Sequence, residues 1–321
     1  MVKLNTIELK PTYSCIQNCV FCCFRDLKTH STMKKSEIED NIDYIKKKYK
    51  DISLFIISGG EPTILYYFWD MLRKIKKDIK PEKLILHSNC LFFSSIDNVN
   101  EIKKYDPVIM ISFHTLKNNF YNKFISKKYS LKEIKKAVKN FNKLKIKFVA
   151  NVLLFNNNLY QLDRITNFLV KNNVYKIEYR LPYTLDLNRH KELLLKDIVK
   201  AKKILFSVIK KYNKKAHITI HPSLICLLGN KGIDKKINFI KKFSQNENLL
   251  KGKYYFFDKF HQFNKCNKND LQLSSVIQDF RNLFFKQDKC KDCEMDQACL
   301  GYPKELESLN FKIEPLIWPK R

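Results

Sequence analysis

Over residues 1–220 the chain alternates short apolar runs with longer stretches of helical periodicity, and this alternation restricts the possible folds most. The apolar runs lie at 51–58, 83–88, 108–114, 146–154, 175–181 and 217–220, after an opening strand at 6–12. The helical stretches lie at 36–49, 65–78, 95–104, 131–144, 158–172 and 189–213, the first and fourth with Ser36 and Ser130 as expected N-caps. Continuous apolar runs are typical of parallel strands that helices cover on both faces.

This order predicts an α/β fold of roughly six or seven strand–helix units, which is fewer than the eight of a closed barrel. We therefore expect an open, partial (β/α)6-type parallel barrel, with its chemistry at the carboxyl ends of the strands. Beyond residue 220 the alternation stops and five more cysteines follow. The sequence thus predicts a core domain at 1–220 and a smaller, cysteine-rich C-terminal extension at 221–321.

Composition narrows the cellular setting. The chain has 321 residues, 45% of them hydrophobic, and no apolar run of 18 residues, so no membrane span is expected. Glu8 and Lys10 fall where a signal peptide would be apolar, which favours a cytoplasmic protein. In that compartment clustered cysteines more often bind metals or catalyse reactions than form disulfides.

The formal net charge of +29 raises the question of a nucleic-acid partner. Lysine is scattered over most of the expected helices, as it would be on a solvated surface. A polyanion such as RNA is the alternative explanation, and the sequence leaves both open.

A cysteine triplet follows the first strand. Cys15, Cys19 and Cys22 have the spacing C-x3-C-x2-C, which allows one loop to offer three thiolates to a single cluster. Zinc with a distant fourth ligand, or buried thiols, are the alternatives. Cys23 is not expected to bind, because adjacent cysteines rarely face the same metal.

A second motif, G-G-E-P at 59–62, follows the next strand. Two glycines let backbone carbonyls approach a ligand closely, and the Glu61 carboxylate suits an ammonium group. Taken alone, the motif is also common in simple turns.

Together, C-I-Q-N-C-V-F-C and G-G-E-P resemble the signature of the radical S-adenosylmethionine (radical SAM) enzymes. The resemblance implies that Cys15, Cys19 and Cys22 hold a [4Fe–4S] cluster with one open iron, which the methionine part of S-adenosylmethionine chelates. The cofactor-binding residues implied are Phe21, Gly59, Gly60, Glu61, Pro62, Ser112, Asn151 and Arg180. S-N-C at 88–90 lies where the family often has Thr-Asn-Gly, and His87 and His114 are expected to be structural or to line the pocket.

The C-terminal motif C-K-D-C-E-M-D-Q-A-C-L-G is similar to the SPASM and twitch extensions of that family, which bind auxiliary iron–sulfur clusters. It implies one auxiliary [4Fe–4S] cluster held by Cys290, Cys293 and Cys299. Cys226 or Cys266 would supply the fourth ligand. A zinc ribbon is the structural alternative.

The function implied is reductive cleavage of S-adenosylmethionine to a 5′-deoxyadenosyl radical, which abstracts hydrogen from a substrate C–H bond. The first hypothesis for the substrate is a peptide or protein, and the alternative is tRNA or rRNA. A non-catalytic iron–sulfur or zinc protein is the third hypothesis. A flavodoxin- or ferredoxin-like electron donor would be the redox partner, and no membrane partner is expected.

Overall fold

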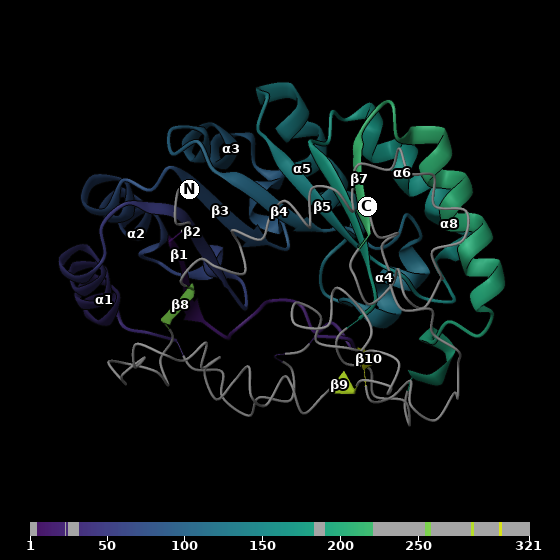
Figure 1. The fold of residues 1–321 in the computed structure, drawn as a ribbon, viewed down its shortest axis with the longest axis horizontal. Coiled ribbons are helices and arrows are strands. Elements are labelled where there is room, and N and C mark those ends of the chain that lie inside the picture. Colours follow the sequence, from purple (N-terminus) through teal and green to yellow (C-terminus); the bar gives the residue numbers. More distant parts are fainter. Residues whose placement is uncertain are drawn as a thin grey trace, which may run out of the picture.

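The computed structural model describes residues 5–22, 24, 32–182 and 190–220, and the backbone of three short strands beyond them (Figure 1). Its centre is an eight-stranded sheet with the order β7-β6-β5-β4-β3-β2-β1-β8, and every neighbouring pair is parallel. The strands are β1 (Asn5–Thr12), β2 (Ile52–Gly59), β3 (Lys83–Ser88), β4 (Val108–Ser112), β5 (Phe148–Leu153), β6 (Lys176–Arg180), β7 (His217–Ile220) and β8 (Tyr254–Phe257). A separate antiparallel pair consists of β9 (Phe284–Phe285) and β10 (Tyr302–Pro303).

Helices connect the strands and lie around the outside of the curved sheet (Figure 1). They are α1 (Lys35–Lys48), α2 (Phe68–Lys74), α3 (Ile96–Lys103), α4 (Asn118–Phe124), α5 (Leu131–Leu144), α6 (Leu162–Lys171) and α8 (Ile198–Tyr212). Shorter turns of other helix types are η1 (Pro62–Ile64), η2 (Ile75–Ile79), η3 (Leu91–Ser94), η4 (Leu159–Gln161) and η5 (Lys191–Leu193).

The predicted α/β fold with an open, partial barrel is confirmed. Strands β1 to β7 follow one another in sequence order across the sheet, and β7 and β8 form its two edges. Strand β8 comes from the region beyond residue 220, yet it pairs with β1 through Thr6–Leu9. The division into 1–220 and 221–321 stays a prediction.

The two faces of the sheet differ in polarity, and here the structure corrects the expectation that helices cover both. One face is mostly apolar and packs against the helices, as with Ile7 and Leu9 of β1 and Phe55 and Ile57 of β2, all 0% exposed. The other face carries polar side chains from the same strands, such as Glu8, Lys10 and Ser58, because successive strand residues point to opposite sides. The polar face lines a cavity.

Helix α5 shows how local sequence fixes an element. Ser130 is its N-cap, as predicted, and the Ser130 Oγ accepts a hydrogen bond from Lys132 N at 3.0 Å. The buried residues Leu131, Ile134, Ala137, Val138 and Phe141 recur at helical spacing and form its inner face. The chain then leaves the helix through Lys145, which has a φ of 57°.

Three details differ from the sequence-based expectations. Helix α1 begins at Lys35, so Ser36 lies inside it and is not its cap. Helix α8 covers Ile198–Tyr212 rather than 189–213, because the Asp197 side chain caps it by accepting Lys200 N–H at 2.8 Å. Helix α4 was not expected, since seven residues are too few for helical periodicity to be recognised.

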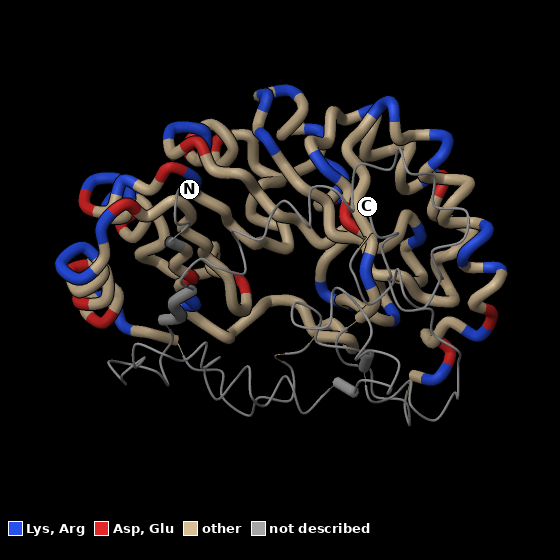
Figure 2. The backbone as a smooth tube through the Cα atoms, in the orientation of Figure 1, with Lys and Arg blue, Asp and Glu red and all other residues tan. Residues whose placement is uncertain are grey.

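Two surface properties bear on partners. Within the described part of the chain, no helix is both long enough and apolar enough to span a bilayer. Figure 2 shows Lys and Arg spread over the outer helices rather than gathered on one face. Within the described residues, the basic charge therefore has the distribution of a solvated surface.

Candidate functional site

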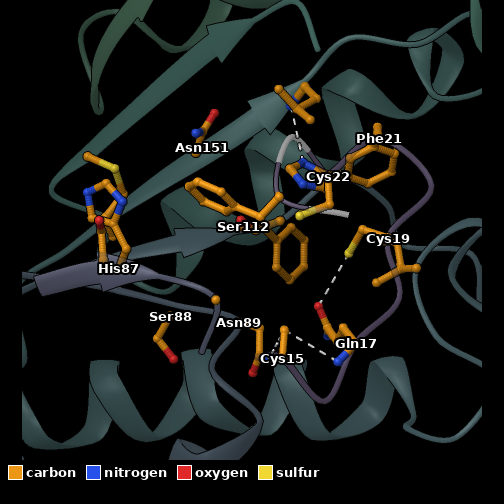
Figure 3. Close-up of a pocket in the computed structure, with 18 of the residues that line it drawn as sticks. Cys15, Gln17, Cys19, Phe21, Cys22, His87, Ser88, Asn89, Ser112 and Asn151 are labelled. Atoms are coloured by element: carbon orange, nitrogen blue, oxygen red, sulfur yellow. Dashed lines mark hydrogen bonds between the residues drawn. The ribbon is translucent and has the colours of Figure 1, made fainter. Parts of the chain in front are cut away.

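A cavity of about 510 Å³ lies over the polar face of the sheet and reaches the carboxyl ends of its strands. Its walls bring together the loop after β1, the turn after β2 and the inward-facing residues of β1 to β6 (Figure 3). Cys15, Cys19 and Cys22 lie on one side of the view, with His87 and Asn151 opposite them. A site at this position agrees with the rule for parallel α/β barrels.

Helix α4, which the sequence analysis missed, holds the cysteine loop in place. Asn18 N donates to Ile125 O at 3.1 Å, and Val20 N donates to Phe124 O at 3.0 Å. The Gln17 side-chain amide donates to Tyr121 OH at 2.8 Å. Hydrogen bonds to the C-terminal end of α4 thus fix the position of the cysteine loop.

The three thiols line the cavity, and none of them is in a disulfide. In the described part of the chain, no three His, Cys, Asp or Glu side chains converge closely enough to hold one metal ion. A multi-iron cluster takes one thiolate for each iron, and the loop offers three thiols on the wall of one cavity.

Cys15 has two hydrogen-bond donors. Gln17 N donates to Cys15 Sγ at 3.4 Å, and Asn89 Nδ2 donates to it at 3.8 Å. Although the side chain can be reached from the cavity, desolvation raises the pKa of the Cys15 thiol to about 11. The thiol is therefore protonated at neutral pH until a bound metal displaces the proton.

The turn after β2 requires glycine at both positions. Gly59 has a φ of +106°, and a Cβ there would lie 2.3 Å from Thr12 O. A Cβ on Gly60 would lie 2.1 Å from Ser14 O. The close approach is held by hydrogen bonds from Gly60 N to Thr12 O at 2.7 Å and from Glu61 N to Ser14 O at 2.9 Å. The glycine turn and the cysteine loop are thus joined backbone to backbone.

Glu61 is fully buried, and its carboxylate accepts four hydrogen bonds. Oε1 accepts from Thr63 N, Thr63 Oγ1 and Ser88 Oγ, and Oε2 accepts from Asn89 N at 2.6 Å. Desolvation raises its pKa above the ordinary value. Glu61 thereby fixes the S-N-C turn after β3, while Pro62 begins η1.

The three strand-end residues expected at the cofactor do line the cavity. Ser112 of β4 pairs in register with Asn151 of β5, and Leu153 pairs with Arg180 of β6. The Asn151 Oδ1 is buried and has no hydrogen-bond partner among the described residues. Arg180 Nη1 lies 3.7 Å from Glu178 Oε1. This buried amide oxygen therefore has the capacity to accept a hydrogen bond from a ligand in the cavity.

Phe21 and the two histidines also lie on the cavity wall. The Phe21 ring packs edge-on against His114, with centroids 5.2 Å apart, and against Phe155 at 4.8 Å. His114 Nδ1 accepts from Leu153 N at 3.2 Å, and burial lowers its pKa to about 3. Burial also lowers the pKa of His87. Both imidazoles are therefore neutral at physiological pH.

Sequence reasoning missed Glu8, Lys10 and Ser58, which also line the cavity. The signal was present, because Glu8 and Lys10 are two charges at alternate positions in an otherwise apolar strand. Asn89 and Gln17 could be recognised only from their contacts. The predicted ligands Cys226, Cys266, Cys290, Cys293 and Cys299 lie outside the described residues, as does Cys23.

Comparisons with known proteins agree with this geometry. Residues 9–169 match the family model described as the Radical SAM superfamily. The chain is 25% identical over 146 residues to a probable dual-specificity RNA methyltransferase RlmN from Leptospira interrogans, and this alignment covers 43% of the chain and 41% of that relative. The chain thus spans less than half the length of this relative.

Two solved structures have the same fold. Streptococcus suis SuiB bound to its precursor peptide SuiA has a TM-score of 0.62 and 15% identity, covering 94% of this chain and 72% of SuiB. Native anSMEcpe with bound AdoMet and a Cp18Cys peptide has a TM-score of 0.56 and 16% identity, covering 66% of this chain and 62% of that one.

Proposed function

The chain belongs to the radical SAM superfamily and is a radical SAM enzyme, and from this premise we propose that it modifies a C–H bond of a peptide or protein. The observation that carries the proposal is the single cavity, whose walls contain the cysteine triplet, the glycine turn and the strand-end polar residues together. These groups come from five different strands or loops, so their convergence is a property of the fold.

The residues present fit the implied cofactors. Cys15, Cys19 and Cys22 are the thiolates that would hold a [4Fe–4S] cluster. The turn at Gly59 and Gly60 lines the cavity directly against the cysteine loop, because a Cβ at either position would meet the backbone of Thr12 or Ser14. This puts the backbone of the turn beside the cysteine ligands, where we place the methionine end of S-adenosylmethionine. We assign the remaining cofactor contacts to Phe21, Ser112, Asn151 and Arg180, which line the cavity. Glu61 and Pro62 are buried and do not line it, so we assign them to support of the glycine turn.

When bound, the reduced cluster and S-adenosylmethionine supply one-electron cleavage of the sulfonium and removal of a hydrogen atom from an unactivated C–H bond. The protein supplies binding and orientation. Arg180 offers a cation to a carboxylate. The buried Glu61 carboxylate acts indirectly, because it holds the turn after β3 through Ser88 Oγ and Asn89 N. The Asn151 oxygen accepts a hydrogen bond from a ligand donor, and the packed rings of Phe21 and Phe155 keep water from this side of the cavity.

A peptide or protein substrate is favoured by the solved structures of the same fold, SuiB and anSMEcpe, which hold bound peptides. RNA is the second candidate, because the chain matches an RNA methyltransferase over part of its length and carries a net charge of +29. RNA binding that weakens steeply with salt would support that second candidate. A flavodoxin- or ferredoxin-like protein is the electron donor we propose.

We also propose one auxiliary [4Fe–4S] cluster on Cys290, Cys293 and Cys299, with Cys226 or Cys266 as its fourth ligand. Its support is the spacing of these cysteines in the sequence.

The experiment that tests the proposal is anaerobic reconstitution followed by iron and sulfide analysis, together with an assay for 5′-deoxyadenosine under strong reductant. About eight irons per chain with 5′-deoxyadenosine formed would support both clusters, and about four would leave only the first. C15A should lose the first cluster, whereas C90A, which removes a buried thiol outside the triplet, should keep it. Zinc alone with no 5′-deoxyadenosine would refute the proposal.

A further inference from the structure

The side chain of Gln17 joins the cysteine loop to helix α4. Its Nε2 donates to Tyr121 OH at 2.8 Å, and its Oε1 accepts a hydrogen bond from the Cys19 thiol, with Sγ 3.6 Å away. The backbone N–H of the same residue donates to Cys15 Sγ at 3.4 Å. Figure 3 shows the contacts of Gln17 with both thiols. One residue thus touches two of the three proposed cluster ligands and a tyrosine that lies outside their loop.

The tyrosine end of this link is fixed by packing. Tyr121 lies on α4 and is 1% exposed, while its hydroxyl faces Gln17 at the cavity wall. A hydroxyl in such a place needs a hydrogen-bond partner, because burying it without one is costly. The contact with Tyr121 therefore holds the Gln17 amide beside Cys19.

The orientation of the amide depends on what the Cys19 sulfur offers. In the free protein the thiol has a proton to donate, and the amide oxygen accepts it. A sulfur bound to iron has no such proton, so the amide oxygen would face it without a hydrogen bond. Turning the amide by half a rotation brings Nε2 to the sulfur and Oε1 to Tyr121, whose hydroxyl can donate as well as accept. Both contacts of Gln17 are kept in this way.

We propose that Gln17 is a positioning residue of the first cluster, whose amide turns when Cys19 binds iron, so that Nε2 donates to Cys19 Sγ and Oε1 accepts from Tyr121 OH. The inference rests on the proposed function, because it takes the cysteine triplet to hold a [4Fe–4S] cluster. A hydrogen bond donated to a cluster sulfur stabilises the reduced, more negative state. Gln17 thus raises the reduction potential, and Tyr121 holds its amide in the donating orientation.

The test compares Q17M with the wild-type protein, both reconstituted at full length and matched in iron content. Methionine is close to glutamine in length, and it removes the amide without adding a charge. The equilibrium constant for reduction should fall about fivefold, which makes the midpoint potential about 40 mV more negative for a one-electron couple. Redox titration followed by EPR measures the potential.

Y121F tests the link from its far end and serves if Q17M takes up no iron. It leaves the amide in place without its anchor, so the potential should shift in the same direction as in Q17M, but by less. Y179F is the matched control, because Tyr179 is 0% exposed and its hydroxyl bonds to Thr166 on α6, away from the thiols. A wild-type potential in Q17M or in Y121F, or an equal shift in Y179F, overturns the inference.

The failure of this inference can be distinguished from the failure of the proposed function. S-adenosylmethionine should change the EPR spectrum of the reduced wild-type cluster. If no cluster forms, or if its spectrum does not change, the proposed function fails. If the spectrum changes and Q17M keeps the wild-type potential, only the role of Gln17 is wrong.

Discussion

The Asn89 side-chain amide donates a hydrogen bond to Cys15 Sγ over 3.8 Å, while its Oδ1 accepts Leu91 N–H at 3.0 Å. The second bond fixes the orientation of the amide, so that its NH2 group faces the thiol. The backbone N–H of the same residue is held by Glu61 Oε2. The buried carboxylate of the glycine turn thus acts on the first cysteine of the triplet through Asn89.

N89A should make the reduction potential of the reconstituted cluster more negative. Hydrogen bonds to cluster sulfurs stabilise the reduced, more negative state, so removing a donor disfavours reduction. The potential is measured by redox titration followed by EPR, at matched iron content. N98A is the control, because Asn98 lies on α3 and its side-chain amide donates to Phe92 O rather than to a thiol. An unchanged potential in N89A would contradict the assigned contact.

G60A should disrupt the junction between the glycine turn and the cysteine loop. The added Cβ would lie 2.1 Å from Ser14 O and 2.6 Å from Tyr13 O, and both are backbone atoms that cannot rotate away. We expect a loss of about 3 kcal/mol or more in the free energy of unfolding, together with a lower iron content after reconstitution. Urea unfolding of the apoprotein and iron analysis measure the two effects. A variant with wild-type stability and iron content would show that the loop tolerates the displacement.

His114 should make the stability of the protein depend on pH. Burial lowers its pKa from 6.5 to about 3, so between these values the unfolded chain binds a proton that the native protein does not. The free energy of unfolding should therefore fall as the pH falls below 6.5, by about 1.4 kcal/mol per pH unit from this residue. In H114N the side-chain amide oxygen can still accept Leu153 N–H. The variant should lose the part of the pH dependence of the free energy of unfolding that His114 contributes.

Urea unfolding of the apoprotein at pH 6.0 and pH 5.0 measures the effect. N98A serves as the control, because it changes no titratable group, and its slope should match that of the wild-type protein. Equal slopes for H114N and the wild-type protein would mean that His114 accepts a proton in the native state.

The sequence predicted the strands well, because a buried parallel strand appears in the sequence as a continuous apolar run. Strands β3 and β7 have the predicted bounds. It could also place the cysteine triplet and G-G-E-P at strand ends, because both are local motifs. It could not reveal that helix α4 fixes the cysteine loop, since contacts such as Val20 N to Phe124 O join residues far apart in the chain. The link from Glu61 through Asn89 to Cys15 was hidden for the same reason.

The polar face of the sheet was hidden for a different reason. Strand β1 alternates Ile7 and Leu9 with Glu8 and Lys10, but seven residues of mixed polarity do not say whether the polar face meets solvent or a cavity. Only the curvature of the whole sheet decides this, because it turns that face inward. The polar cavity lining from Glu8, Lys10 and Ser58 therefore had to be found from the structure.

Two serine N-caps offer a matched test of local stability. Ser130 Oγ accepts Lys132 N–H at the start of α5, and the Glu133 carboxylate accepts Ser130 N–H at 2.8 Å. Ser95 occupies the same position before α3, but its side chain makes no capping bond. S130A should thus lower the free energy of unfolding by about 1 kcal/mol, whereas S95A should change it by less than about 0.5 kcal/mol. Urea unfolding of the two apoproteins measures both values, and equal losses would show that residue type at the cap, rather than the hydrogen bond, sets the effect.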